Sequence, residues 1–138
     1  MAEFGMSMEP PKKGIVESLR KSFTLGGAKE KWYQDHQEYN KAIQYYTEII
    51  QINPKNKNAH FNLGYIHHEY PKVYDQAIKH YTDAINADPN YAEAYYNRGL
   101  CYEYVGNITA AKEDYTKALQ LRQNNYPHAK EGLERVSR

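Results

Sequence analysis

The sequence predicts an all-α protein built from three consecutive helix pairs. Three observations support this prediction. The same pattern of small and aromatic residues returns with a period of about 34 residues. Apolar residues within each unit follow the spacing of one helix face, and no stretch shows the alternation of polar and apolar residues typical of a strand. We therefore expect stacked units, each burying its apolar face against its neighbours.

The second helix of each unit is defined by an alanine, a tyrosine and a further small or aliphatic residue. The alanines are Ala42, Ala77 and Ala111, the tyrosines are Tyr46, Tyr81 and Tyr115, and the third positions hold Ile49, Ala84 and Ala118. The tyrosine comes four residues after the alanine, and the third position three residues later again. This spacing keeps all three side chains on one stripe of a helix, which we expect to face the core.

Prolines and asparagines mark the expected helix ends. Pro54 and Pro89 follow the second helices of the first two units, and proline cannot continue a helix. Asn58 and Asn90 stand where the next helices are expected to begin. Because an asparagine side chain can accept a hydrogen bond from a free helical amide, we expect both residues to cap those helices.

The first helices of the second and third units each contain a glycine. Gly64 lies in the segment Phe61–Tyr65, and Gly99 lies in the segment Tyr95–Tyr102. Together with the alanine and tyrosine pattern, these segments resemble the tetratricopeptide repeat, over roughly residues 24–123. The resemblance implies a right-handed superhelical solenoid of antiparallel helix pairs. In such a fold, glycine lets the two helices of one unit approach closely.

The resemblance divides the chain into units of unequal quality. The three units cover about 24–56, 57–91 and 92–125. The first is degenerate, because Glu30 stands where the other units place glycine, and it is expected to be an end repeat. The second unit carries one extra residue, which must lie in the turn between His67 and Tyr74. That turn is the part of the array least dictated by the repeat and is a second candidate for specific recognition.

The two ends of the chain lie outside the repeats. Residues 1–14 are expected to be a disordered tail, although Glu3-Phe4 also matches what a common cloning site encodes, so that these residues can derive from cloning. Residues 15–23 can form a short amphipathic helix that either packs on the first unit or stays a loose tail. Residues 126–138 are expected to form a helix that caps the array, since the last unit would otherwise expose its apolar face.

Composition excludes several classes of function. The 18 basic residues nearly balance the 17 acidic ones, so no charged surface for nucleic acid is expected. No apolar run approaches the roughly 20 residues of a membrane-spanning helix, and no signal peptide is recognisable. The single Cys101 cannot close a disulfide within the chain. The compartment is not determined by these features, but they favour the cytoplasm.

We expect no metal site, no cofactor and no enzyme activity. His67 and His68 are adjacent and point to different faces of a helix, while His60 lies about 10 Å from His67 along the helix axis. His67 is therefore interpreted as a core histidine, and Cys101 as a small buried hydrophobe. The sequence contains no phosphate-binding loop and no serine elbow.

A concave groove lined by the first helices is the expected binding site. Its expected residues are Asn58, Phe61, Asn62, Tyr65, His68, Glu69, Glu93, Tyr96, Asn97, Leu100 and Tyr104. Asn62 and Asn97 are placed to hydrogen-bond a peptide backbone, and the aromatic residues offer rigid contact area. The alternative interpretation is that the repeat pattern alone accounts for the asparagines and several of the tyrosines.

Charge suggests which peptide the groove would hold. Asp35, Glu69, Glu93 and Glu103 are expected to make its rim acidic, which favours a peptide carrying Lys or Arg. Chaperone-binding members of the family hold a C-terminal carboxylate with Lys, Asn and Arg side chains. Among the matching positions only Asn62 carries the expected residue, while Gly27, Lys31, Glu93 and Asn97 stand at the others. Because Glu93 would repel a carboxylate, the chaperone C-terminal motif is disfavoured.

The expected function is therefore that of a protein–protein interaction scaffold which binds a peptide segment of a partner. Two alternatives remain open. The chain can be a self-associating structural module that forms a homo-oligomer, or a regulatory segment of a larger enzyme whose catalytic domain lies elsewhere. No nucleic acid and no membrane is expected among the partners.

Overall fold

The computed structural model describes residues 28–69 and 72–138, and for residues 28–36 it describes the helical backbone only. The expected tail at residues 1–14 and the expected short helix at residues 15–23 lie outside this described part.

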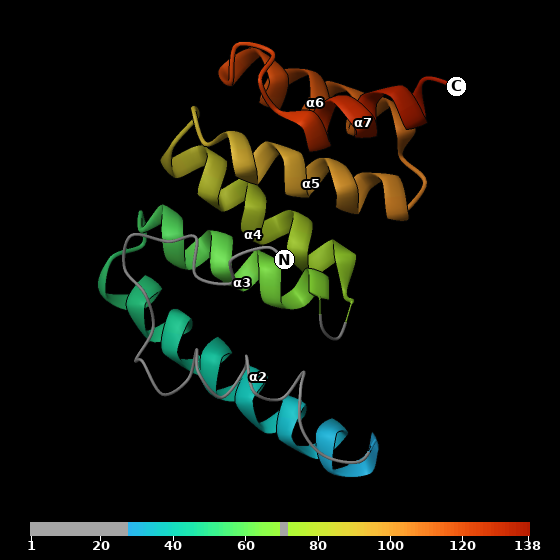
Figure 1. Ribbon diagram of the computed structural model, residues 1–138. Helices are drawn as coiled ribbons and strands as arrows, with labels where there is room; N and C mark the ends of the chain where they lie inside the picture. Colours follow the sequence, from blue (N-terminus) through green and yellow to red (C-terminus); the bar gives the residue numbers. More distant parts are fainter. Residues whose placement is uncertain (1–27, 70–71) are drawn as a thin grey trace.

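Six helices follow one another along the described chain and stack in sequence order from one end of the molecule to the other (Figure 1). They are α2 (Ala28–Ile52), α3 (Lys57–Glu69), α4 (Tyr74–Ala87), α5 (Ala92–Tyr104), α6 (Ile108–Leu121) and α7 (Pro127–Val136). Each helix packs mainly against its neighbours in the chain. The described residues contain no strand, which confirms the all-α prediction.

The second and third units are helix pairs, α3 with α4 and α5 with α6, but the first unit is not. The sequence predicted a pair there, and this prediction is wrong, because α2 is one continuous helix of 25 residues. The reason lies in its middle. Between Trp32 and Ala42 the sequence contains neither glycine nor proline, so nothing ends the first helix before the second begins.

The repeated small and aromatic residues form the core as predicted. Ala42, Ala77, Ala111, Tyr46, Tyr81 and Tyr115 all have 0% of their surface exposed. The glycines allow close contact between the helices of a unit. A Cβ atom on Gly64 would lie 2.7 Å from the Tyr81 ring, and one on Gly99 would lie 2.9 Å from the Tyr115 ring. Each tyrosine ring therefore occupies the space that a side chain on the facing helix would need.

Two helices are capped by asparagines, but the capping residues are not the two asparagines that were predicted. The Asn56 side chain accepts a hydrogen bond of 3.0 Å from the Ala59 amide at the start of α3, and Asn107 does the same at the start of α6. Asn58 lies inside α3, and Asn90 lies in the turn before α5. The cap is the residue just before the first helical one, which is Asn56 for α3 and Tyr91 for α5. The sequence pattern therefore placed the first cap two residues too late and the second one residue too early.

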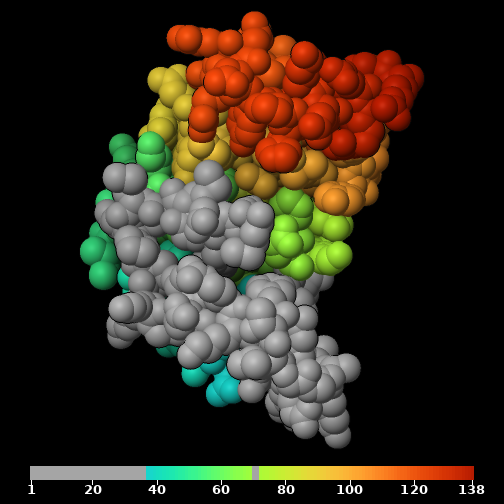
Figure 2. Space-filling view, in the orientation of Figure 1, coloured from blue at the N-terminus to red at the C-terminus, as the bar shows by residue number. Residues whose placement is uncertain are grey.

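Helix α7 covers the end of the third unit (Figures 1 and 2). Gly132 allows it to lie against Tyr115, since a Cβ there would stand 2.8 Å from the ring. The Tyr115 hydroxyl donates a 2.7 Å hydrogen bond to Glu103, whose carboxylate also accepts two hydrogen bonds from Arg135 of α7. The closing helix is thus held by both packing and an ion pair.

The turns inside the two helix pairs differ in length by one residue, as predicted. Helix α3 ends at Glu69 and α4 begins at Tyr74, whereas α5 ends at Tyr104 and α6 begins at Ile108. Both turns contain a residue in the left-handed region of the backbone. In the shorter turn it is Gly106, with φ of 85°, and in the longer turn it is Lys72, with φ of 69°.

Among the described helices, none combines the length and the apolar character needed to cross a membrane.

Candidate functional site

The eleven residues expected to line the groove differ widely in their exposure. Asn58, Phe61, Asn62 and His68 are buried; Tyr65, Glu93, Tyr96, Asn97 and Leu100 are partly buried; Glu69 and Tyr104 are exposed. They come from the first helices of the two complete pairs, α3 and α5. The set therefore contains both core residues and residues that a ligand can reach.

Phe61 belongs to the core, and its assignment as a groove contact is wrong. Its side chain is fully buried. The ring centre lies 5.5 Å from that of Tyr81 and 5.1 Å from that of Tyr91, on which it stacks. The helical spacing that placed Phe61 on the outer side of α3 did not show that the loop and helix of the next unit would cover it.

His68 is also a packing residue rather than an accessible contact. Its Nδ1 lies 3.3 Å from the Tyr81 hydroxyl, so the two groups share a hydrogen bond. Burial, with a smaller contribution from Lys72, lowers the pKa of His68 to about 4. The imidazole is therefore neutral near pH 7. Of the aromatic rings around it, Tyr104 is the most accessible, with 62% of its surface exposed, and it stacks on Tyr74 at 4.8 Å.

The two asparagines expected to bind a peptide backbone are not equivalent. Asn97 lies in α5, and its side-chain nitrogen donates a 2.9 Å hydrogen bond to the Glu93 carbonyl of its own helix. Asn62 lies in α3 and is fully buried, yet neither its oxygen nor its nitrogen has a hydrogen-bond partner among the described residues. Leaving such a group unpaired costs about 1–3 kcal/mol.

The expected acidic rim is largely neutralised within the chain. Glu93 forms an ion pair with Arg122 of α6. Glu103 accepts hydrogen bonds of 2.7 and 2.8 Å from Arg135, which lower the pKa of its carboxyl below the usual range. The side chain of Asp35 lies outside the described residues. Glu69 is then the one described rim carboxylate without an ion pair, so the charge argument for a basic peptide is weaker than the sequence suggested.

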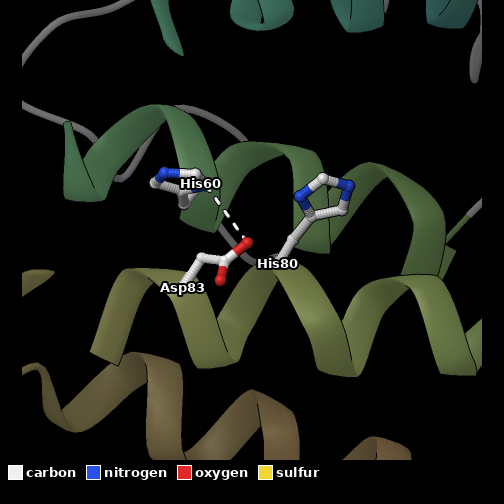
Figure 3. Close-up of side chains that lie close together, drawn as sticks. All are labelled: His60, His80 and Asp83. Atoms are coloured by element: carbon white, nitrogen blue, oxygen red, sulfur yellow. Dashed lines mark ion pairs between the residues drawn. The ribbon is translucent and has the colours of Figure 1, made fainter. Parts of the chain in front are cut away.

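A second group of polar side chains lies between α3 and α4, apart from the expected groove residues. His60 on α3 faces His80 and Asp83 on α4 (Figure 3). One potential ligand atom from each residue lies within 4.8 Å of the other two. Histidine spacing along a single helix did not predict this group, because its members come from two helices. The available signal was the spacing of His80 and Asp83, three residues apart on the helix that pairs with that of His60.

Comparisons with known protein families agree with the repeat pattern. Profiles of the tetratricopeptide repeat match residues 33–56 and 92–125, and a TPR repeat profile matches residues 73–106. Together these matches cover more than half of the chain. No curated protein sequence gives a match.

Solved structures similar to this one are domains of the same repeat. The TPR domain of OM64 from Arabidopsis is 25% identical, with a TM-score of 0.69, and the match covers 91% of this chain and 93% of that one. The first TPR domain of Spaghetti (RPAP3), bound to the HSP90 peptide SRMEEVD, is 24% identical, with a TM-score of 0.68 and coverage of 89% and 90%. The second TPR domain of human RPAP3, in complex with the HSP70 peptide SGPTIEEVD, is 23% identical, with a TM-score of 0.68 and coverage of 91% and 97%.

These complexes conflict with the expectation that a chaperone C-terminal motif is disfavoured. Two structures of the same fold hold chaperone peptides. The expectation depended on two points, the absence of the clamp residues at all matching positions except Asn62 and the repulsion by Glu93. The structure shows that Arg122 pairs with the Glu93 carboxylate, which answers the second point and not the first.

Proposed function

The chain belongs to the tetratricopeptide-repeat family, and from this premise we propose that it is an interaction scaffold which binds a peptide segment of a partner protein along α3 and α5. Repeats of this family are in general interaction modules rather than enzymes. The proposed contact uses the residues of the expected groove that remain partly or fully exposed, together with Asn62. Asn62 is as buried as Phe61, but its amide lacks a partner among the described residues, so a contact with it requires the groove to open.

The unpaired amide of Asn62 is the observation that carries the proposal. Buried polar groups in folded proteins are almost always hydrogen-bonded, and an exception calls for an explanation. A peptide backbone offers both a donor and an acceptor, which are the two groups that the Asn62 side chain needs. Satisfying the amide would recover about 1–3 kcal/mol, which offsets part of the cost of opening the groove to admit the peptide.

Aromatic side chains would supply most of the contact area. Tyr65 of α3 and Tyr96 of α5 are partly buried, and Tyr104 at the end of α5 is largely exposed. Tyrosine is enriched among the residues that dominate binding energy, because its ring is rigid and its hydroxyl can hydrogen-bond. With two complete helix pairs, we expect a dissociation constant of about micromolar, roughly −8 kcal/mol.

The proposal commits to a peptide but not to its charge. Glu69 favours a basic residue near the end of α3, whereas the pairing of Glu93 with Arg122 leaves the middle of the face without a net charge. Both basic peptides and peptides with an acidic C-terminal sequence and a free carboxylate are therefore candidate ligands.

Fluorescence polarisation with short labelled peptides tests the proposal. Basic, neutral and acidic C-terminal peptides, including SRMEEVD, would be titrated with the wild-type chain and with Asn62→Leu. Leucine has a similar volume and cannot hydrogen-bond, so it should weaken the tightest peptide by at least about tenfold, the equivalent of 1.4 kcal/mol. Gln120→Ala, an exposed change on α6, is the matched control and should bind as the wild type does.

Two results would overturn the proposal. One is the absence of saturable binding by every peptide class to the wild-type chain. The other is equal affinity of the wild type and Asn62→Leu, with circular dichroism showing that both are folded. Which peptide class binds best then decides between a chaperone-type C terminus and a basic segment.

A further inference from the structure

We propose that His60, His80 and Asp83 form a binding site for a divalent transition-metal ion, with zinc as the preferred ion, that links α3 to α4 in the second repeat. The site shares no residue with the proposed peptide-binding face, so the two proposals can be tested independently.

The three side chains converge from facing helices. His80 and Asp83 extend from α4 toward α3, and the Asp83 carboxylate points at His60 (Figure 3). The His60 Nδ1 lies 3.8 Å from an Asp83 oxygen, which is too long for a hydrogen bond. Two ligand atoms bound to one tetrahedral zinc stand about 3.4 Å apart, given zinc–ligand distances near 2.1 Å. A small rotation of these side chains would therefore bring them into coordinating distance.

His60 is already oriented as a metal ligand. Its Nε2 lies 2.8 Å from the carbonyl oxygen of Pro54, so this nitrogen carries the proton and donates it to the carbonyl. The Nδ1 atom then holds a free lone pair directed at Asp83. A histidine that binds a metal usually donates its other ring nitrogen to a carbonyl or a carboxylate, because this fixes the tautomer and the ring orientation.

Two ring nitrogens at this site lack other partners among the described residues. His60 Nδ1 and His80 Nδ1 are both buried without a hydrogen bond to any described residue. The His80 ring is held in place by the parallel ring of His67, with centres 5.3 Å apart. The Asp83 side chain is 37% exposed, which leaves an approach from solvent. The site thus combines buried nitrogen donors with an open side through which an ion can enter.

The repeat pattern does not require these residues. The equivalent positions of the third repeat hold Tyr95, Asp114 and Lys117, a set that cannot coordinate a cation in the same way. Two imidazole nitrogens and one carboxylate oxygen suit zinc and similar ions, whereas calcium and magnesium prefer oxygen ligands alone. Three protein ligands leave a fourth position for water.

Calorimetric titration with zinc chloride tests the site directly. The protein would carry no histidine tag and would be stripped of metal with a chelator before the titration. We expect about one ion per chain, and His80→Gln or Asp83→Asn should each weaken binding by at least about tenfold. His128→Gln is the matched control, because His128 is an exposed histidine of α7, and it should bind zinc as the wild type does.

Two measurements on the wild-type chain keep the test valid if a variant fails to fold. Zinc should raise the melting temperature, since an ion that binds the folded state stabilises it. Nitrogen NMR of the imidazole rings should show that zinc shifts Nδ1 of His60 while Nε2 keeps its proton. Absence of saturable zinc binding, or binding lost in His128→Gln and kept in His80→Gln, would overturn the proposal.

Discussion

The second and third repeats share one apolar skeleton and differ in how they use polar residues. Gly64 faces Tyr81 in the second repeat as Gly99 faces Tyr115 in the third. The hydroxyl groups of these two tyrosines also form hydrogen bonds with residues at equivalent positions of α3 and α5. His68 is the partner of Tyr81, and Glu103 is the partner of Tyr115.

The difference lies in the remaining polar groups. In the third repeat Arg98 donates two hydrogen bonds of 2.8 Å to Asp114, and Glu103 pairs with Arg135. In the second repeat, by contrast, Asn62 and His80 have buried polar atoms without a hydrogen bond to the described residues. Groups that are fully paired stabilise the fold, whereas unpaired groups cost stability and are more readily explained by a ligand.

The largest expected effect is at the ion pair of the third repeat. Arg98→Met leaves the Asp114 carboxylate, which is 4% exposed, without its partner. We expect the free energy of unfolding to fall by about 3–5 kcal/mol, because a buried charge has lost its counter-charge. Urea unfolding followed by circular dichroism measures this change.

The control is a substitution of Leu63, which occupies the position of the second repeat equivalent to Arg98. Leu63→Met keeps the volume of an apolar side chain and should cost less than about 1.5 kcal/mol. If the two substitutions cost the same, the ion pair is not what distinguishes the third repeat.

Acid should destabilise the second repeat at a higher pH than the third. The pKa of His68 is about 4 in the folded chain and about 6.5 in an unfolded one, so the unfolded state binds more protons between these values. Stability is retained above pH 6.5 and falls as the pH drops toward 4, by as much as ~3 kcal/mol. Arg135 lowers the pKa of the Glu103 carboxyl. The contribution of Glu103 to the free energy of unfolding is therefore lost only as the pH falls below the ordinary pKa range of a carboxyl group.

Urea unfolding at a series of pH values tests this order. His68→Gln should remove the contribution of His68, so that the free energy of unfolding changes less between pH 6.5 and pH 4. The partly buried His67 and His80, whose pKa values burial also lowers, keep their own contributions to the pH dependence. A profile identical to that of the wild type would show that His68 does not titrate as its burial implies.

A smaller effect of opposite sign is expected at Asn62. Asn62→Leu replaces an unpaired buried amide with an apolar side chain of similar volume, and should raise the free energy of unfolding by about 1–2 kcal/mol. Asn97→Leu removes a hydrogen bond within α5 and should not stabilise the chain. Thermal unfolding of the two variants compares them, and stabilisation by both would remove the distinction between the asparagines.

The smallest expected effects concern the turns of the two repeats. Lys72→Gly relieves a left-handed backbone position and should stabilise the chain by about 0.5–1 kcal/mol. Gly106→Ala places a side chain at a position of the same kind and should destabilise it by about 1 kcal/mol. Both changes are measured by thermal unfolding, and the prediction requires that they have opposite signs.

Several parts of the candidate site could not be predicted from sequence spacing. Spacing on α3 placed Phe61 and Asn62 on a common face, but only packing decides that Phe61 stacks on Tyr91 while Asn62 stays unpaired. The ion pair of Glu93 with Arg122 joins residues far apart in the chain, and it changed the expected charge of the groove.

The sequence by itself determined the all-α architecture, the repeat register and the buried alanine, glycine and tyrosine skeleton. These features follow from local periodicity, because the same contacts recur in each helix pair. The sequence also held the reason why the first unit is one continuous helix, since no glycine or proline separates Trp32 from Ala42. Only the tertiary structure decided that His60 meets His80 and Asp83. That outcome depends on which side chains an antiparallel neighbour brings opposite, and this is not encoded in spacing along a single helix.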